Sequence, residues 1–206
     1  MAFATIDVTK GITGTIPVAN GGTGLTSGTS GQFLKFTGTT TVGSAAVDSG
    51  LTEVDMWRLE ADFTQTAEPI TNNFERVDSN SFSKIGTGLT FSSGVWTFGV
   101  LGLYKITFQS QHRRNGENPS LEQVIQVSSN AGGAWGTAVK GYPALQDYGS
   151  STVYSSGSCH CILNVSGTAS NFQVRLMISN ASEAYTNGSS TQNRTYIMFE
   201  RLGDAQ

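Results

Sequence analysis

Charged side chains are scarce in this chain of 206 residues, where they make up 13% of the sequence. That is about half the share found in an ordinary soluble domain. The 12 basic and 15 acidic residues give a formal net charge of −3, so we expect no basic surface for nucleic acid. No apolar run approaches about 18 residues, so we expect no membrane insertion. The N-terminal residues lack a basic stretch followed by an apolar one, and no secretory signal is expected.

Cysteine and histidine are almost absent, which leaves little for metal chemistry. Cys159 and Cys161 are two residues apart in a predicted strand, so both thiols face the same side and His160 faces the other. One ion cannot easily bind all three, and an intrachain disulfide would distort the strand. We therefore expect two free thiols on an inner face and no metal. His112 is followed by two arginines, and this sequence predicts that His112 lies at a strand end exposed to solvent. The alternative is that it contacts a small anion or a glycan.

Catalytic patterns are also missing. The sequence contains no Gly-x-Ser-x-Gly nucleophile motif, and its few carboxylates form no pair suited to glycoside hydrolysis. Glu53 with Asp55 and Glu60 with Asp62 are spaced two apart, and we expect solvated or interface positions for them. The sequence therefore indicates a protein that is not an enzyme, with no catalytic residues and no cofactor.

Residues 1–51 differ in composition from the rest of the chain. They contain no Trp and no Tyr, and their only charged residues are Asp7, Lys10, Lys35 and Asp48. Such a segment cannot bury enough apolar surface to fold alone, so a flexible linker is one interpretation. Its Val, Ile and Thr content and near-zero charge favour the other, an extended arm or short shaft that is ordered by partner chains.

A glycine-rich motif lies within this arm: Gly14-Thr15-Ile16-Pro17-Val18-Ala19-Asn20-Gly21-Gly22-Thr23-Gly24. Pro17 favours extended backbone before it, and the Asn-Gly-Gly sequence favours a turn. Together with Gly31-Gln32-Phe33-Leu34-Lys35, the motif resembles a segment common in bacteriophage tail-fibre and related virion proteins. The resemblance covers residues 11–36 and implies a virion protein with intertwined chains. On that basis, the residues expected to make particle attachment or interchain packing are Ile16, Pro17, Val18, Asn20, Gly21, Gly22 and Gly24.

Residues 52–206 show the alternation of half-buried β-strands. Three series illustrate it: Tyr104, Ile106 and Phe108; Cys159, Cys161, Leu163 and Val165; and Phe172, Val174, Leu176 and Ile178. Leu121, Ile125 and Val127 form a fourth series, which Gln123 interrupts. Clusters of Gly, Ser and Asn separate the strands, and no helical periodicity appears. The pattern predicts an all-β sandwich or jelly roll.

A second resemblance concerns this C-terminal part. Gly94-Val95-Trp96-Thr97-Phe98, Gly102-Leu103-Tyr104-Lys105-Ile106-Thr107-Phe108 and the final segment from Thr195 to Leu202 look like strands of the C1q/TNF-like jelly roll. The resemblance implies a ten-strand sandwich that assembles as a homotrimer. The long polar loops of this sequence differ from the loops of the best-known family members, so we transfer no ligand site from that family.

Aromatic residues in Gly- and Ser-rich surroundings are the candidates for surface recognition: Trp135, Tyr142, Tyr148, Tyr154 and Tyr185. Such rings, next to Asn and Ser, suit sugar or protein contacts, although core filling or trimer contact is the simpler interpretation. Trp57 and Trp96 lie in patterned strands and are expected in the core.

We therefore expect a non-enzymatic virion protein, made in the host cytoplasm and displayed on the particle exterior. Residues 1–51 would attach to other virion proteins, and residues 52–206 would form a trimeric knob at a tail fibre or its tip. The knob would bind a host-surface glycan or protein. A trimeric capsid decoration protein, or head fibre, is the first alternative, and a free glycan-binding module is the second.

Overall fold

The computed structural model describes residues 22, 23, 25, 28–39, 41–45, 50–64, 66–71, 73–79, 81–115, 121–146, 149, 151–179 and 184–206. These residues fall into two compact units, one ending at Gly50 and the other running from Leu51 to Gln206. The described part contains β-strands and one short 3-10 helix, η2 (Ala169–Asn171). No helix within the described ranges is long and apolar enough to cross a membrane.

The first unit contains one antiparallel hairpin, formed by β1 (Phe33–Phe36) and β2 (Val42–Ala45). All four residues of β1 are exposed, including two phenylalanines and one leucine. A two-stranded hairpin is marginal in water without a packed face, so this hairpin has no core of its own among the described residues.

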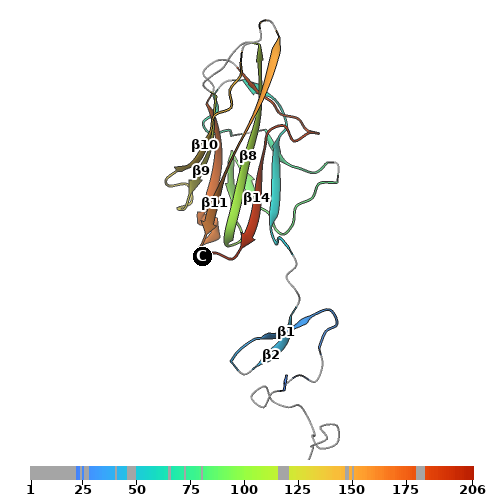
Figure 1. The fold of residues 1–206 in the computed structure, drawn as a ribbon. Coiled ribbons are helices and arrows are strands. Elements are labelled where there is room, and N and C mark those ends of the chain that lie inside the picture. The colour runs from blue at the N-terminus through green and yellow to red at the C-terminus, as the bar shows by residue number, and fades with distance from the viewer. Residues whose placement is uncertain are drawn as a thin grey trace, which may run out of the picture. The chain divides into compact units, whose positions relative to one another are not determined.

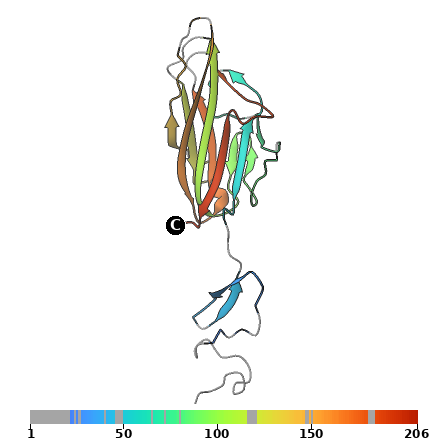
Figure 2. The same ribbon diagram turned by 45° about the vertical axis from the view of Figure 1, so that its right-hand side comes forward.

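The second unit is a sandwich of two antiparallel sheets (Figures 1 and 2). The smaller sheet has the strand order β10 (Gly136–Gly141), β9 (Glu122–Ser128), β12 (Gln173–Ser179), β7 (Val95–Thr97) and β6 (Thr90–Ser92). In the larger sheet, five strands lie in the order β11 (Thr152–Val165), β8 (Gly102–Asn115), β14 (Tyr196–Gly203), β3 (Val54–Leu59) and β5 (Phe74–Arg76). Two further strands of two residues each, β13 (Tyr185–Thr186) and β4 (Phe63–Thr64), continue beside the second half of β8.

The predicted alternation of apolar and polar residues agrees with the side of each strand that faces the interior. Tyr104, Ile106 and Phe108 of β8 are buried, and so are Val174, Leu176 and Ile178 of β12. Trp57 and Trp96 also lie in the core, as predicted. Trp96 packs against Phe91 and Phe74, with ring centroids 4.7 and 5.0 Å apart. The all-β sandwich predicted from the sequence is therefore confirmed, and β4 and β13 are the strands beyond the ten that the resemblance implied.

The β6–β7 hairpin shows how local sequence sets register. Ser93 and Gly94 form its two-residue turn, and both have positive φ angles, 49° and 82°. Two-residue turns of this kind match the twist of the flanking strands. A Cβ atom at Gly94 would lie 2.3 Å from the carbonyl oxygen of Ile70, so the position also needs glycine for space.

Candidate interaction surfaces

The outer face of the larger sheet carries few charges. One row of directly paired residues crosses four strands: His160 of β11, Thr107 of β8, Met198 of β14 and Met56 of β3. The hydroxyl of Thr107, at the centre of this row, has no hydrogen-bond partner in the part of the chain described. We call this surface the β8–β14 face. It is a half-exposed surface in which uncharged polar and sulfur-containing side chains predominate.

The rows on either side of the central one are also largely neutral. On one side, Ser158, Gln109 and Tyr196 are paired, and the Tyr196 hydroxyl donates to Gln109 Oε1 at 3.2 Å. This row ends in β3 at Arg58, whose charge is buried and paired with Glu75. On the other side, Lys105 Nζ lies 3.0 Å from Glu200 Oε2, so these two charges neutralise each other. Ile162 is paired with Lys105 and is 61% exposed, which places an apolar side chain at the margin of the face.

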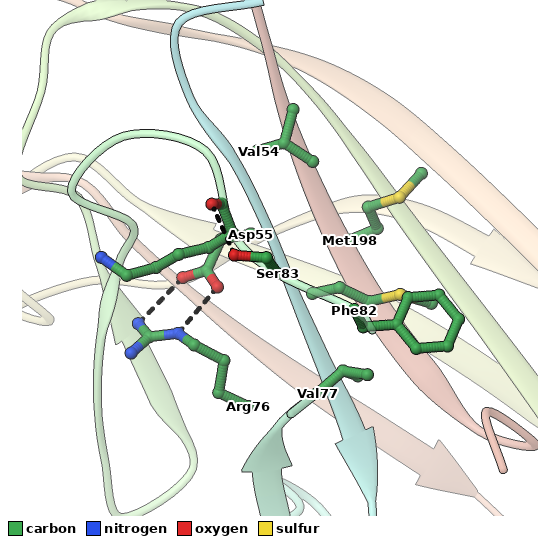
Figure 3. A pocket seen from close by; sticks show the side chains of 9 residues that line it. Val54, Asp55, Arg76, Val77, Phe82, Ser83 and Met198 are labelled. Carbon is green, nitrogen blue, oxygen red and sulfur yellow. Dashed lines mark hydrogen bonds and ion pairs between the residues drawn. The ribbon is translucent and has the colours of Figure 1, made fainter. Parts of the chain in front are cut away.

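A small cavity adjoins the β8–β14 face over β3. It has a volume of about 190 Å³, and Val54, Met56, Val77, Phe82 and Met198 supply most of its wall. Figure 3 shows Phe82 and Met198 on one side of it and the Asp55–Arg76 ion pair on the other. Phe82 is half-exposed at the rim, so the cavity opens as an apolar depression.

The Asp55 carboxylate beside this cavity is buried and fully hydrogen-bonded. It accepts from Arg76 Nε and Nη2 at 2.8 and 3.0 Å, from Trp57 Nε1 at 3.1 Å and from the Leu89 amide at 2.8 Å. Glu53, two residues earlier, accepts from the amides of Thr87 and Gly88. The expectation that Glu53 and Asp55 are solvated is therefore wrong. They hold residues 87–89 against β3, which leaves no carboxylate here free for proton transfer.

A groove of about 510 Å³ lies where the β9–β10 hairpin approaches β11. Its lining includes Trp135, Val127 and Leu163, with Ser129 and Asn130 as polar groups. The Arg175 guanidinium lies 4.3 Å from the Trp135 ring centroid and donates to Gln126 Oε1 at 2.7 Å. Arg175 is not among the residues that line the groove. The half-buried indole of Trp135 therefore contacts Arg175 through a cation–π interaction and borders the groove with another part of its surface.

The other predicted recognition residues lie away from this groove. Tyr142 is exposed beyond the opposite end of β10, and Tyr148 falls outside the described residues. Tyr154 and Tyr185 are brought together, because both are paired with Arg113 from opposite sides of β8. Arg113 stacks on Tyr185 at 4.1 Å and binds Asp62 at 2.7 Å. The sequence could not indicate this Tyr–Arg–Tyr arrangement, because it depends on the pairing of three separate strands.

His112 is fully buried, so its predicted position at a solvated strand end is wrong. Its Nε2 lies 2.8 Å from Ser110 Oγ, and its Nδ1 lies 3.3 Å from Thr186 Oγ1. The Gln123 amide donates to Ser110 Oγ and to the Gly157 carbonyl, and it accepts from the Cys159 amide at 3.0 Å. Burial lowers the pKa of His112 to about 4, so the ring is neutral at pH 7. Ser110 and His112 both lie on β8, and the bond from Gln123 of β9 to Ser110 connects the larger sheet with the smaller one. Neither Ser110 nor His112 lines the cavity over β3 or the groove beside Trp135.

The cysteine segment has the predicted orientation. Cys159 and Cys161 face the core, and His160 is exposed on the opposite side of β11. Both thiols are free, and burial raises the pKa of Cys161 to about 11. Among the described residues, no group of three His, Cys, Asp or Glu side chains could hold a metal ion.

The residues expected to attach to the particle are mostly beyond what the structure describes. Ile16, Pro17, Val18, Asn20, Gly21 and Gly24 lie outside the described residues. Gly22 alone is described, as a half-buried bend residue. Their assigned role stays a prediction from the sequence.

Comparison with known proteins reveals a similarity of fold. No protein-family profile and no curated sequence matches the chain. Among solved structures, murine APRIL at pH 5.0 is similar with a TM-score of 0.51 at 13% identity, covering 73% of this chain and 98% of that one. Eiger TNF from S. frugiperda is similar with a TM-score of 0.51 at 10% identity, covering 76% of this chain and 96% of that one. The second unit therefore has the TNF-like jelly-roll fold that its strand pattern indicated.

Proposed function

We propose that the chain is a non-enzymatic bacteriophage virion protein that works as a homotrimer. Residues 1–51 attach it to the particle, and the jelly roll is displayed outward to bind the host surface at a tail fibre or its tip. The virion assignment rests on the motif within residues 11–36, and the jelly-roll fold is compatible with it. The β8–β14 face is the observation that carries self-association.

The β8–β14 face suits contact with a second copy for two reasons. Its central row is uncharged and holds two methionines, which adapt to irregular partner surfaces. Ile162 at the margin is an exposed apolar group of the kind that fills a depression such as the one beside Phe82.

Trimerisation would explain how weak surface contacts become firm attachment. Three identical sites on one rigid assembly engage a repeated host surface together, and the second and third contacts are then intramolecular. Linked sites can raise overall binding by about 10²- to 10⁴-fold without any new contact.

Sedimentation equilibrium of the full chain tests self-association through this face. The wild-type chain should sediment as a trimer at micromolar concentration, and Met198→Glu should sediment as a monomer. Met177→Glu is the matched control, because Met177 is a half-buried methionine on the outer side of β12 in the other sheet. A monomeric wild-type chain, or a trimeric Met198→Glu variant, would contradict the proposal.

Imaging of labelled particles tests the location. A gold label on the C-terminal residue should appear at the tail fibres if the chain is a fibre component. A label spread over the capsid would instead identify the head-fibre alternative, and particles without label would contradict the virion assignment.

A further inference from the structure

The groove beside Trp135 has the composition of a sugar site. None of its eight lining residues is charged: Val127, Ser128, Ser129, Asn130, Ala134, Trp135, Gly136 and Leu163. An indole and two aliphatic side chains form the apolar part, and hydroxyl and amide groups form the polar part. A sugar ring has the same division, with C–H groups on its faces and hydroxyls around its edge. Sites for small ligands are typically apolar with a few placed polar groups, as here.

The aromatic ring and the polar turn are held in place before any ligand arrives. Arg175 is stacked on Trp135 and is itself bound to Gln126. Asn130 Oδ1 accepts from the Ala134 amide and from Ser128 Oγ, both at 2.8 Å. Ser128 Oγ also accepts from the Gly132 amide at 3.0 Å. Because the turn is already fixed, little conformational entropy is lost when a ligand binds. This matters for a sugar, whose contacts are weak and could not offset a large ordering cost.

Gly136 is the reason that the groove is open. In the β9–β10 pairing Gly136 is opposite Val127, so a side chain at either position projects from the same side of the sheet. Val127 lines the groove, and a Cβ atom at Gly136 would meet nothing within 4 Å. Its φ angle is not in the left-handed region, so the backbone does not require glycine there. A larger side chain would therefore fit without a clash and project into the groove.

From these observations we propose that the groove between the β9–β10 turn and β11 binds a neutral pyranose sugar, with Trp135 as its stacking platform. This rests on the proposed function, because it assigns the host-surface contact of the displayed jelly roll to glycan. The absence of charge in the lining selects against acidic sugars, since no cationic side chain lines the groove to pair with their carboxylate. The Ser129 hydroxyl and the Asn130 side-chain amide supply the polar contacts to the sugar hydroxyls.

Titration of the full chain with methyl glycosides tests this proposal. The probes are the methyl glycosides of glucose, galactose, mannose and N-acetylglucosamine, with glucuronic acid as the acidic comparison. We expect millimolar binding of at least one neutral glycoside, seen as a change in tryptophan fluorescence and in the Trp135 indole NMR signal. Glucuronic acid should bind at least 10-fold more weakly. Bacterial surface polysaccharides that contain the bound sugar should then bind the assembled chain at least 100-fold more tightly.

Two variants of the groove and one control separate a sugar site from a structural feature. Trp135→Ala removes the platform, and Gly136→Val places a side chain in the groove beside Trp135 while leaving the indole itself unchanged. Both should lose binding at least 10-fold with unchanged sedimentation. Tyr142→Ala removes an exposed aromatic ring at the other end of β10 and should bind like the wild type. Sugar binding that survives Gly136→Val, or the absence of binding to all four neutral glycosides, overturns the proposal.

The oligomeric state distinguishes this failure from failure of the proposed function. If Gly136→Val dissociates the assembly, the groove holds part of a second copy and is not a sugar site, while trimerisation itself stands. If the wild-type chain binds sugar but sediments as a monomer, the groove assignment stands and the trimer is wrong.

Discussion

At the scale of single residues, the described interior includes two polar arrangements held together by hydrogen bonds. One is the chain of hydrogen bonds from Gln123 through Ser110 and His112 to Thr186. The other is the buried Asp55 carboxylate with its four donors. Buried polar groups are stable only when each has a partner, so both arrangements should respond strongly to the loss of one member.

The stability of the protein should fall between pH 6.5 and pH 4 because of His112. Its pKa is about 4 in the folded protein and about 6.5 when unfolded, so in this range the unfolded chain takes up a proton that the folded chain excludes. The contribution is fully present above pH 6.5 and is lost as the pH falls through 4. The loss is about 3 kcal/mol in the free energy of unfolding.

Urea unfolding of the wild type and His112→Asn at pH 7, 5 and 4 measures this effect. The variant should be less stable at pH 7, since Asn cannot reproduce every contact, but its stability should change less with pH. Carboxylates contribute equally to both proteins, so the difference between the two curves isolates the histidine. Parallel curves would mean that His112 does not titrate in this range.

Asp55→Ala should destabilise the protein by about 3 kcal/mol, because it leaves Trp57 Nε1, the Leu89 amide and Arg76 Nε without their acceptor. Asp204→Ala is the matched control. Asp204 also binds an arginine, Arg201, at 2.6 Å, but its side chain is 93% exposed. Exposed pairs of this kind contribute under about 1 kcal/mol, so the control should be nearly neutral in denaturant unfolding. Equal effects of the two substitutions would refute the role given to burial.

At the scale of elements, strand alternation predicts faces well but does not predict what covers them. The faces of β8, β11 and β12 follow directly from their period-2 patterns, because each strand is half-buried. His112 was misplaced because the arginines that follow it suggested solvent, whereas Thr186 of β13 covers it. The sequence does not reveal the burial of Glu53 and Asp55, because each accepts a hydrogen bond from a backbone amide more than 30 residues away. Such contacts depend on strand register, which no local pattern reveals.

In the groove beside Trp135, too, some features follow from the local sequence and others depend on strand register. The sequence could indicate Trp135 as an aromatic residue among Gly and Ser. It could not indicate that Gly136 would be opposite Val127, or that Leu163 of β11 would complete the lining. The signal in the sequence is Trp135 followed directly by Gly136, an aromatic ring beside a residue without a side chain.

At the scale of the whole molecule, the two units have different tasks in the proposed function. The jelly roll from Leu51 onward contains the packed core, and the hairpin before Gly50 exposes most of its apolar side chains. A chain divided in this way can lose its first unit without losing the fold of its second, because none of the first unit's described residues belongs to the core of the jelly roll.

Deletion of residues 1–50 should leave a folded trimer that no longer incorporates into particles. The full chain and the truncated chain can be compared by thermal unfolding, by sedimentation and by retention on purified virions. We expect unfolding temperatures within a few degrees of each other, equal sedimentation behaviour and loss of retention. A truncated chain that stays on virions at the level of the full chain would place attachment in the jelly roll.

The two inward-facing thiols of β11 allow the rate at which this strand opens to be measured. Thiolate is the reactive form of cysteine, and the raised pKa of Cys161 leaves almost none of it at neutral pH. Cys159, on the same face, is buried against the core. A thiol reagent can therefore modify Cys159 only when β11 leaves the sandwich, so the labelling rate of Cys159 measures how often this strand opens, without any engineered probe. If the chain is displayed outside a cell, as we propose, no chaperone can refold it there, and the rate of opening then sets how long it stays functional.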